Sequence, residues 1–129
     1  MKNLIRSIAL TAFLFTSVFA SAQRMPAKSP EKRAENQVAW MQKKIGITED
    51  QRKKAFDIIL KYGIQVDELK NTPKSRARKS EIIAINSDRD SELQSVLSEE
   101  QFRQYKAHEQ DLKDRMKERH SEMQNGSGN

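Results

Sequence analysis

The sequence predicts an all-α fold of four helices, in an open arrangement or a dimer. Beyond residue 22, apolar residues recur at helical spacing, and no strand-like alternation appears. Hydrophobic residues make up 36% of the 129 residues and charged residues 33%. A domain this small and this polar cannot enclose a deep core alone, so an open arrangement or a dimer is expected.

The N-terminal segment predicts export. Lys2 and Arg6 precede an apolar run over residues 8–19, and Ala20-Ser21-Ala22 is a small-residue cleavage site. The run is shorter than the ~20 residues needed to cross a bilayer, so residues 1–22 are expected to be a cleaved signal peptide rather than an anchor. The chain has no cysteine, and the mature protein must therefore fold by packing alone.

Residues 23–29 contain Pro26 and predict a flexible leader. Ser29 followed by Pro30 then opens a helix over residues 30–45. Its apolar face consists of Ala34, Val38, Met41 and Ile45. Gly46 is expected to end it in a left-handed conformation.

A second helix is expected over residues 49–70. One of its faces carries Ala55, Ile59, Tyr62, Val66 and Leu69. The uninterrupted run Ile58-Ile59-Leu60 widens this apolar surface, so the helix is either central or exposes apolar side chains.

In the third helix, Thr72 is expected to be the cap, with Pro73 at the first position. Basic residues cluster near this start, where the helix dipole disfavours them, which suggests a role other than stability: Lys74, Arg76, Arg78 and Lys79.

The fourth helix is expected to begin after Ser98 and to end at Gln124, which gives a helical domain over 30–124. Its apolar residues have heptad-like spacing: Phe102, Tyr105, Leu112, Met116 and Met123. Residues 125–129 predict a disordered tail.

Two five-residue motifs organise this pattern. Ile47-Thr48-Glu49-Asp50-Gln51 and Leu97-Ser98-Glu99-Glu100-Gln101 both read apolar, hydroxyl, acid, acid, glutamine, and they lie fifty positions apart. In each motif, the hydroxyl is expected to accept a hydrogen bond from a backbone N–H of the first helical turn. The glutamine side chain is expected to bond back to the backbone N–H of the cap residue, as in a capping box. The motifs therefore predict helix starts and carry no chemistry of their own.

These motifs resemble the two LTxxQ motifs of the periplasmic Spy/CpxP proteins, with Ile47 in place of leucine and Ser98 in place of threonine. The resemblance implies a periplasmic, all-helical protein whose helical hairpins form an open, curved, cradle-like homodimer. It also implies that this homodimer protects unfolded clients without ATP during envelope stress. It implies no residue-by-residue client contacts, because the motif covers only the helix starts.

From local chemistry, the candidates for client binding are Arg52, Lys53, Phe56, Arg76 and Arg78. Cations attract unfolded chains over a distance, and apolar side chains then hold them weakly. In the alternative, the cations are a solvated face and the apolar residues are buried in a dimer.

Metal binding is a second alternative. Met116, His120 and Met123 lie at i, i+4 and i+7, and thioether and imidazole ligands suit Cu(I). Methionine at this spacing also serves for packing. No grouping of nucleophile and base is evident, so neither an enzyme nor a cofactor is expected. The interspersed charges, at net +6, do not favour nucleic acid as a partner.

Overall fold

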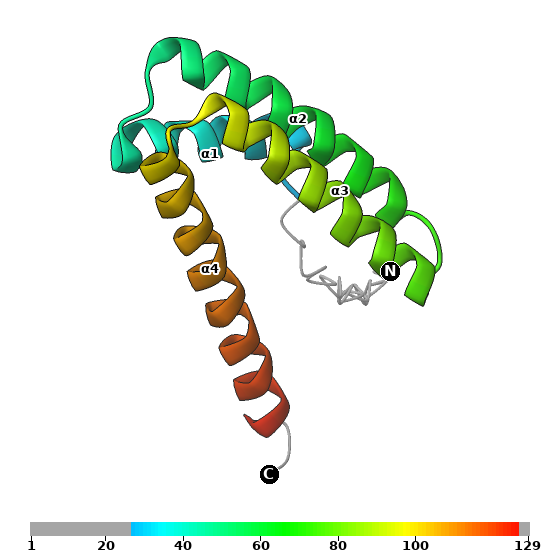
Figure 1. Cartoon of the computed structure of the whole chain (residues 1–129). Helices are drawn as coiled ribbons and strands as arrows, with labels where there is room; N and C mark the ends of the chain where they lie inside the picture. The colour runs from blue at the N-terminus through cyan, green and yellow to red at the C-terminus, as the bar shows by residue number, and fades with distance from the viewer. Residues whose placement is uncertain (1–26, 127–129) are drawn as a thin grey trace, which may run out of the picture.

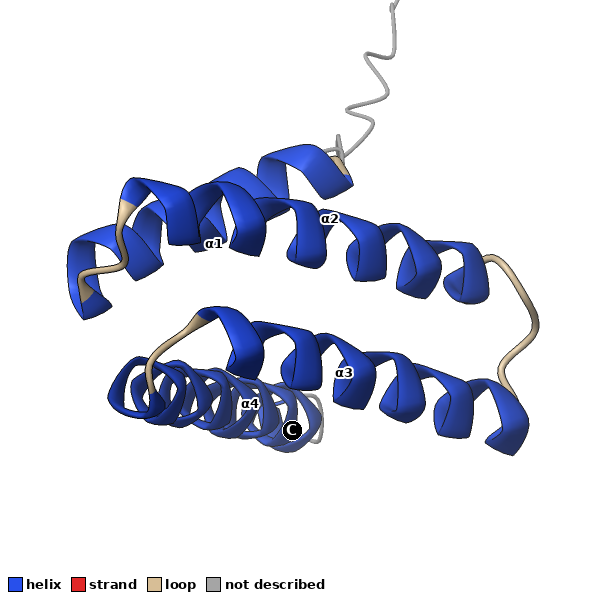
Figure 2. Cartoon of the chain, turned by 45° about the horizontal axis from the view of Figure 1, so that its top comes forward, coloured by secondary structure: helices blue, strands red, loops and turns tan. Residues whose placement is uncertain are grey.

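The computed structural model describes residues 27–126, which form four α-helices and no strand (Figures 1 and 2). The helices are α1 (Pro30–Ile45), α2 (Glu49–Lys70), α3 (Arg76–Val96) and α4 (Glu99–Gly126). The all-α prediction is confirmed. None of these helices is long and apolar enough to cross a membrane. The predicted signal peptide, most of the leader and residues 127–129 lie outside the described residues.

The first two helices have the predicted bounds. The Ser29 side chain accepts from the Lys32 backbone N–H at 3.3 Å, with Pro30 in the first turn. Gly46, at φ 67°, ends α1 in the left-handed region, where a residue with a Cβ is strained.

The third helix starts later than predicted. Ser75, not Thr72, is the cap of α3, and its side chain accepts from the Arg78 backbone N–H at 3.0 Å. Thr72 instead donates its hydroxyl to the Leu69 carbonyl at 2.6 Å, and Pro73 lies in the connecting loop. Two hydroxyl residues compete for the cap here, and Thr72 is already bonded to the end of α2.

The fourth helix runs further than predicted, through Gly126 rather than Gln124. Its first part packs against α1 and α3, whereas every residue from Gln110 to Gly126 is exposed. We call residues 110–126 the arm. In Figure 1, α4 leaves the other three helices at a steep angle, while α2 and α3 run side by side. Figure 2 shows α1 and α2 above α3 and α4.

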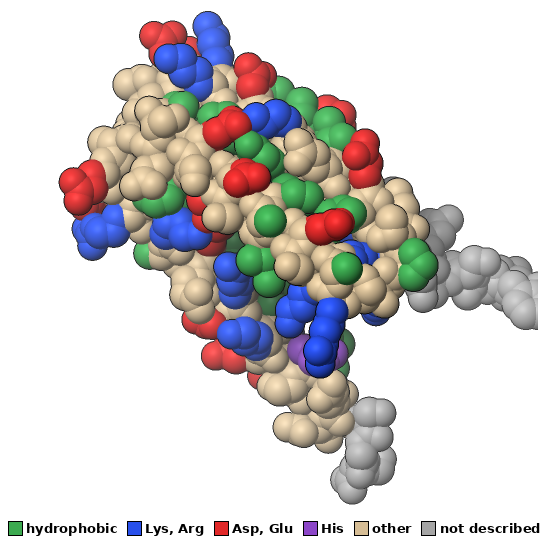
Figure 3. Space-filling view, turned by 45° about the vertical axis from the view of Figure 1, so that its right-hand side comes forward, with side chains coloured by type: hydrophobic (Ala, Val, Ile, Leu, Met, Phe, Trp, Pro, Cys, Tyr) green, Lys and Arg blue, Asp and Glu red, His purple; other side chains and the backbone are tan. Residues whose placement is uncertain are grey.

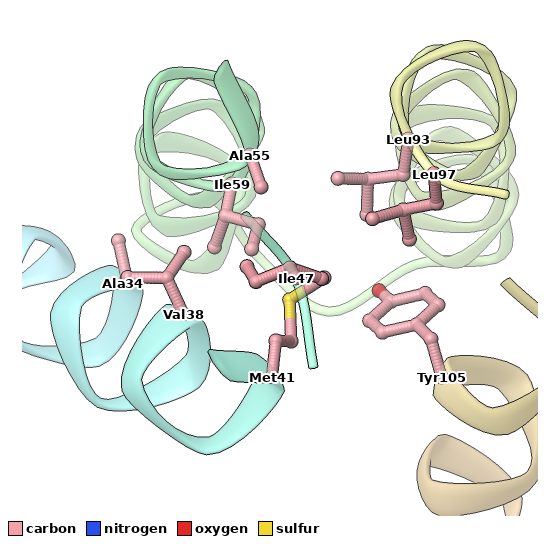
Figure 4. Close-up of a cluster of buried hydrophobic side chains, with 9 residues drawn as sticks. All are labelled: Ala34, Val38, Met41, Ile47, Ala55, Ile59, Leu93, Leu97 and Tyr105. Carbon is pink, nitrogen blue, oxygen red and sulfur yellow. The ribbon is translucent and has the colours of Figure 1, made fainter. Parts of the chain in front are cut away.

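The core lies where the four helices meet (Figure 4). Its members are Ala34, Val38, Met41, Ile47, Ala55, Ile59, Leu93, Leu97 and Tyr105. No polar or charged residue is buried in the described part of the chain. The apolar run of α2 is not sealed: Ile58 and Leu60 are half-buried, and Ile64 is 39% exposed. The single chain is therefore open, while the homodimer stays a prediction.

Candidate binding face between α1, α3 and α4

Both predicted capping boxes form. The Gln51 side-chain oxygen accepts from the Thr48 backbone N–H at 2.9 Å, and the Thr48 hydroxyl accepts from the Gln51 N–H at 3.2 Å. The second motif repeats this geometry, with 2.9 Å from the Ser98 N–H to Gln101 Oε1 and 3.1 Å from the Gln101 N–H to the Ser98 hydroxyl. Each motif thus starts a helix, as predicted.

The two boxes also bond to each other. Gln51 donates from Nε2 to Gln101 Oε1 at 2.8 Å and to the Val96 carbonyl at 3.1 Å. Gln101 donates from Nε2 to Gln51 Oε1 at 3.3 Å and to the Gly46 carbonyl at 3.4 Å. Gly46 and Val96 are equivalent positions, each just before its motif. We call residues 46–51 and 96–101 together the motif joint, because they tie the starts of α2 and α4 into one unit.

The apolar first residue of each motif completes the joint. Ile47 and Leu97 are both buried in the common core, beside Met41 and Tyr105 (Figure 4). Sequence analysis predicted each helix start but missed the pairing between them. The fifty-residue repeat was the available signal, since equal motifs can pair about an approximate two-fold axis.

A polar network fixes the first part of α4 against α3. Arg89 donates to Asp90 and to Glu109, each at 2.8 Å, and Lys106 is paired with Asp90. Burial alone would raise the pKa of Asp90, but hydrogen bonds from Lys106 and Arg89 outweigh it, and the pKa lies below its usual value. Burial raises the pKa of Tyr105, so its hydroxyl stays neutral and donates to Glu109 at 2.9 Å.

A second contact joins α4 to α1. The rings of Trp40 and His108 are stacked, with centroids 3.8 Å apart and planes inclined by 14°. Nearer the start of α1, Arg33 pairs with Asp67 of α2 at 2.5 Å. The hydrogen bond from Arg33 is the main cause that lowers the pKa of Asp67. These contacts hold α1 between α2 and α4.

Three hollows meet between these elements. A cleft of about 550 Å³ separates α1 from α4, and its lining consists of Lys28, Arg33, Asn36, Gln37, Trp40, His108, Glu109 and Leu112. A second hollow, between α1, α2 and α3, shares Arg33 and Gln37 with this cleft. A third, between α3 and α4, shares Asn86 and Arg89 with the second. We call this continuous surface the inner face.

The inner face combines apolar and polar groups. Trp40 and Leu112 supply apolar surface, and the amides of Gln37 and Asn86 can each donate and accept hydrogen bonds. On the side drawn in Figure 3, Lys and Arg side chains gather beside a histidine, below a belt of hydrophobic and acidic side chains. The inner face therefore offers both apolar contact and hydrogen-bonding groups to a ligand.

The predicted client-binding residues lie outside the inner face and form two separate groups, of which Arg52, Lys53 and Phe56 line one hollow. Arg52 is paired with Glu35 at 2.5 Å and with Glu49 at 3.4 Å. This shallow hollow is separate from the inner face.

Arg76 and Arg78 lie at the start of α3, beside the opposite end of α2, a helix roughly 33 Å long. Arg76 is exposed, and Arg78 donates to the Thr72 carbonyl at 2.5 Å. The structure therefore does not bring the two basic groups together.

The candidate metal ligands lie on the arm. Met116 is 70% exposed and Met123 68% exposed. The Nε2 of His120 lies 2.8 Å from the side-chain nitrogen of Gln124. Among the described residues no group of three or more His, Cys, Asp or Glu could hold a metal ion. The structure assigns no packing role to the two methionines within one chain.

Comparisons with known proteins give a family but no activity. No curated protein and no solved structure matches the chain. A family model matches residues 20–105, a span that includes both motifs and all of α1, α2 and α3. The match ends at Tyr105, so most of α4 lies beyond it. The chain belongs to the family described as domain of unknown function DUF4890.

Proposed function

We propose that this protein is an ATP-independent periplasmic chaperone that binds unfolded or misfolded proteins in the envelope stress response. The observation that supports this most is the inner face, where three hollows with mixed apolar and polar linings meet on an open helical chain. The predicted signal peptide and the resemblance of the two motifs to those of Spy/CpxP proteins both support a periplasmic location.

Holding a client on such a face needs neither a nucleotide nor a covalent step. Apolar side chains of the client lose water when they meet Trp40, Leu112 and their neighbours, which gives a non-directional gain of roughly 25 cal/mol per Å². The chain stays net positive after Lys2 and Arg6 are removed with the predicted signal peptide, so its exposed cations speed the encounter with acidic clients. Binding of this kind is weak and reversible, as release without ATP requires.

An aggregation assay tests this function. A chemically denatured client is diluted with the purified protein at low and at high salt, and light scattering is followed. We expect suppression at both salts, with slower capture at high salt because only the encounter is screened. If the protein suppresses aggregation neither at low salt nor at high salt, the proposal is wrong.

We further propose that the protein forms a homodimer through the arm. Met116 and Met123 lie seven residues apart on one helix face, and both are exposed. Arg115 and Glu122 flank them with opposite charges, so two antiparallel copies of the arm can pair these charges across the contact. Sedimentation equilibrium of Met116→Glu against the wild type tests this, and equal masses for the two proteins would exclude the arm as the interface.

The alternative function is metal binding or sensing by the same fold. It is favoured by the exposure of Met116 and Met123 beside His120, on a helix that leaves all three side chains available to an ion. Titration with Cu(I) and Zn(II), compared with His120→Ala, separates this function from the chaperone. A Cu(I) affinity that His120→Ala does not change excludes a site there.

A further inference from the structure

Of the three hollows, the cleft between α1 and α4 has the most apolar lining and contains the only tryptophan of the chain. We propose that this cleft is the client anchor, and that it takes an apolar side chain with a neighbouring carboxylate in an unfolded segment. The inference rests on the proposed chaperone function and names the segment that it selects.

The apolar part of the site is preformed. His108 stacks on Trp40 with centroids 3.8 Å apart, so the indole is held in one orientation before a client arrives. Leu112 lies one helical turn beyond His108 and is 46% exposed, so it faces the same cleft without being sealed. An immobilised aromatic ring next to an open apolar side chain binds apolar groups at a low cost in entropy. At about 550 Å³ the cleft is large enough for more than one client side chain.

The polar part of the site suits a polypeptide backbone. Asn36 and Gln37 lie on the α1 side of the cleft, and each amide offers both a donor and an acceptor. The N–H and C=O groups of an extended chain need such partners once they leave water. The recognition of backbone groups is independent of sequence, which matches a chaperone that has many clients.

The charge at the rim of the cleft favours one kind of client residue beside the apolar side chain. Arg33 is already paired with Asp67, and Glu109 is paired with Arg89. Lys28 has no ion pair among the described residues, and its backbone carbonyl is held at the cleft by a 2.6 Å hydrogen bond from Arg33. The remaining charge at the rim is therefore positive, which favours a client carboxylate over a client lysine.

Tryptophan fluorescence tests the site, because Trp40 is the sole tryptophan. The purified protein is titrated with a blocked, unstructured peptide that contains Leu-Phe-Glu, and with the same peptide containing Leu-Phe-Lys. We expect the first peptide to shift the Trp40 emission and to bind more tightly than the second, with a preference that salt reduces. If a peptide binds by calorimetry without changing the Trp40 emission, the cleft is not the anchor.

Variants separate the cleft from the rest of the molecule. Leu112→Gln should weaken peptide binding by about tenfold, and Lys28→Gln should remove the preference for glutamate. Ile64→Gln is the matched control, because Ile64 is 39% exposed, close to the 46% of Leu112, and lines none of the three hollows. Urea unfolding checks that all three variants are folded. Equal peptide affinities for Leu112→Gln and Ile64→Gln would overturn the inference.

The aggregation assay separates failure of the anchor from failure of the chaperone function. If the wild type and Leu112→Gln suppress aggregation equally, the protein is a chaperone whose anchor lies elsewhere. If the wild type neither suppresses aggregation nor binds either peptide, the function itself is wrong. We expect the wild type to suppress aggregation, Leu112→Gln to suppress it less, and Ile64→Gln to suppress it as well as the wild type.

Discussion

The motif joint and the arm both carry apolar side chains among charged residues, yet one is closed and the other open. At the joint, Ile47 and Leu97 are buried, and four hydrogen bonds from glutamine side chains cross between its two segments. On the arm, Met116 is 70% exposed and Met123 68% exposed. The difference shows that these apolar side chains are buried only where another segment is held against them.

The largest expected effect comes from breaking the joint. Leu97→Ala should lower the free energy of unfolding by about 2–5 kcal/mol, because it leaves a cavity in the shared core. Measured at a protein concentration where the chain is monomeric, Met116→Ala on the arm should change it by less than about 0.5 kcal/mol. Urea denaturation followed by circular dichroism compares the two variants. Similar losses would mean that the arm is covered as fully as the joint.

A smaller loss of stability is expected from breaking the ion-pair network that holds α4 against α3. Asp90→Asn should cost about 1.5–3 kcal/mol near neutral pH, since it removes a charged acceptor from Lys106 and Arg89. Because the folded-state pKa of Asp90 lies below its ordinary value, its contribution is present above about pH 3.9 and is lost as pH falls through the folded pKa.

The measurement for this network is the free energy of unfolding of the wild type minus that of Asp90→Asn, from neutral pH down to acid. This difference should shrink below about pH 4. Asp114→Asn on the arm is the control and should change stability little at any pH. A difference that stays constant with pH would contradict the assigned pKa direction.

The smallest effects compare two glycines. Gly46 has φ 67° at the joint, so Gly46→Ala should destabilise the protein by about 1 kcal/mol through backbone strain alone, since its Cβ would meet nothing. Gly63 lies within α2, and a Cβ there would also meet nothing. Gly63→Ala should therefore stabilise the protein by about 0.4–1 kcal/mol. Thermal unfolding measures both variants, and shifts of the same sign would contradict this.

Local sequence rules predicted the helices well because caps and stops act within a few residues. Ser29 and the two motifs predicted three of the four helix starts, and Gly46 predicted the end of α1. The predicted start of α3 at Thr72 was wrong because Thr72 and Ser75 are both good caps. The hydroxyl of Thr72 is bonded to the end of α2, so Ser75 caps α3.

The inner face could not be predicted, because it depends on which segments meet. Trp40 and His108 are far apart in the sequence, and nothing local marks them as partners. The predicted client-binding residues were chosen for their neighbours in the sequence, and the length of α2 separates Arg52 from Arg76 in space. The same limit applies to α4. Its apolar residues keep the same spacing along the helix, so the sequence does not indicate that Tyr105 is buried while the arm is exposed.

A double-mutant cycle on Gln51 and Gln101 tests most directly whether the two motifs act as one unit. Each single change to alanine should cost about 1–2 kcal/mol, because it opens one capping box and the bonds across the joint. Since the crossing bonds are lost with either change, the double variant should cost less than the sum, with a coupling of at least about 0.5 kcal/mol. Costs that add within about 0.3 kcal/mol would show that the motifs are two independent helix caps and would contradict the account.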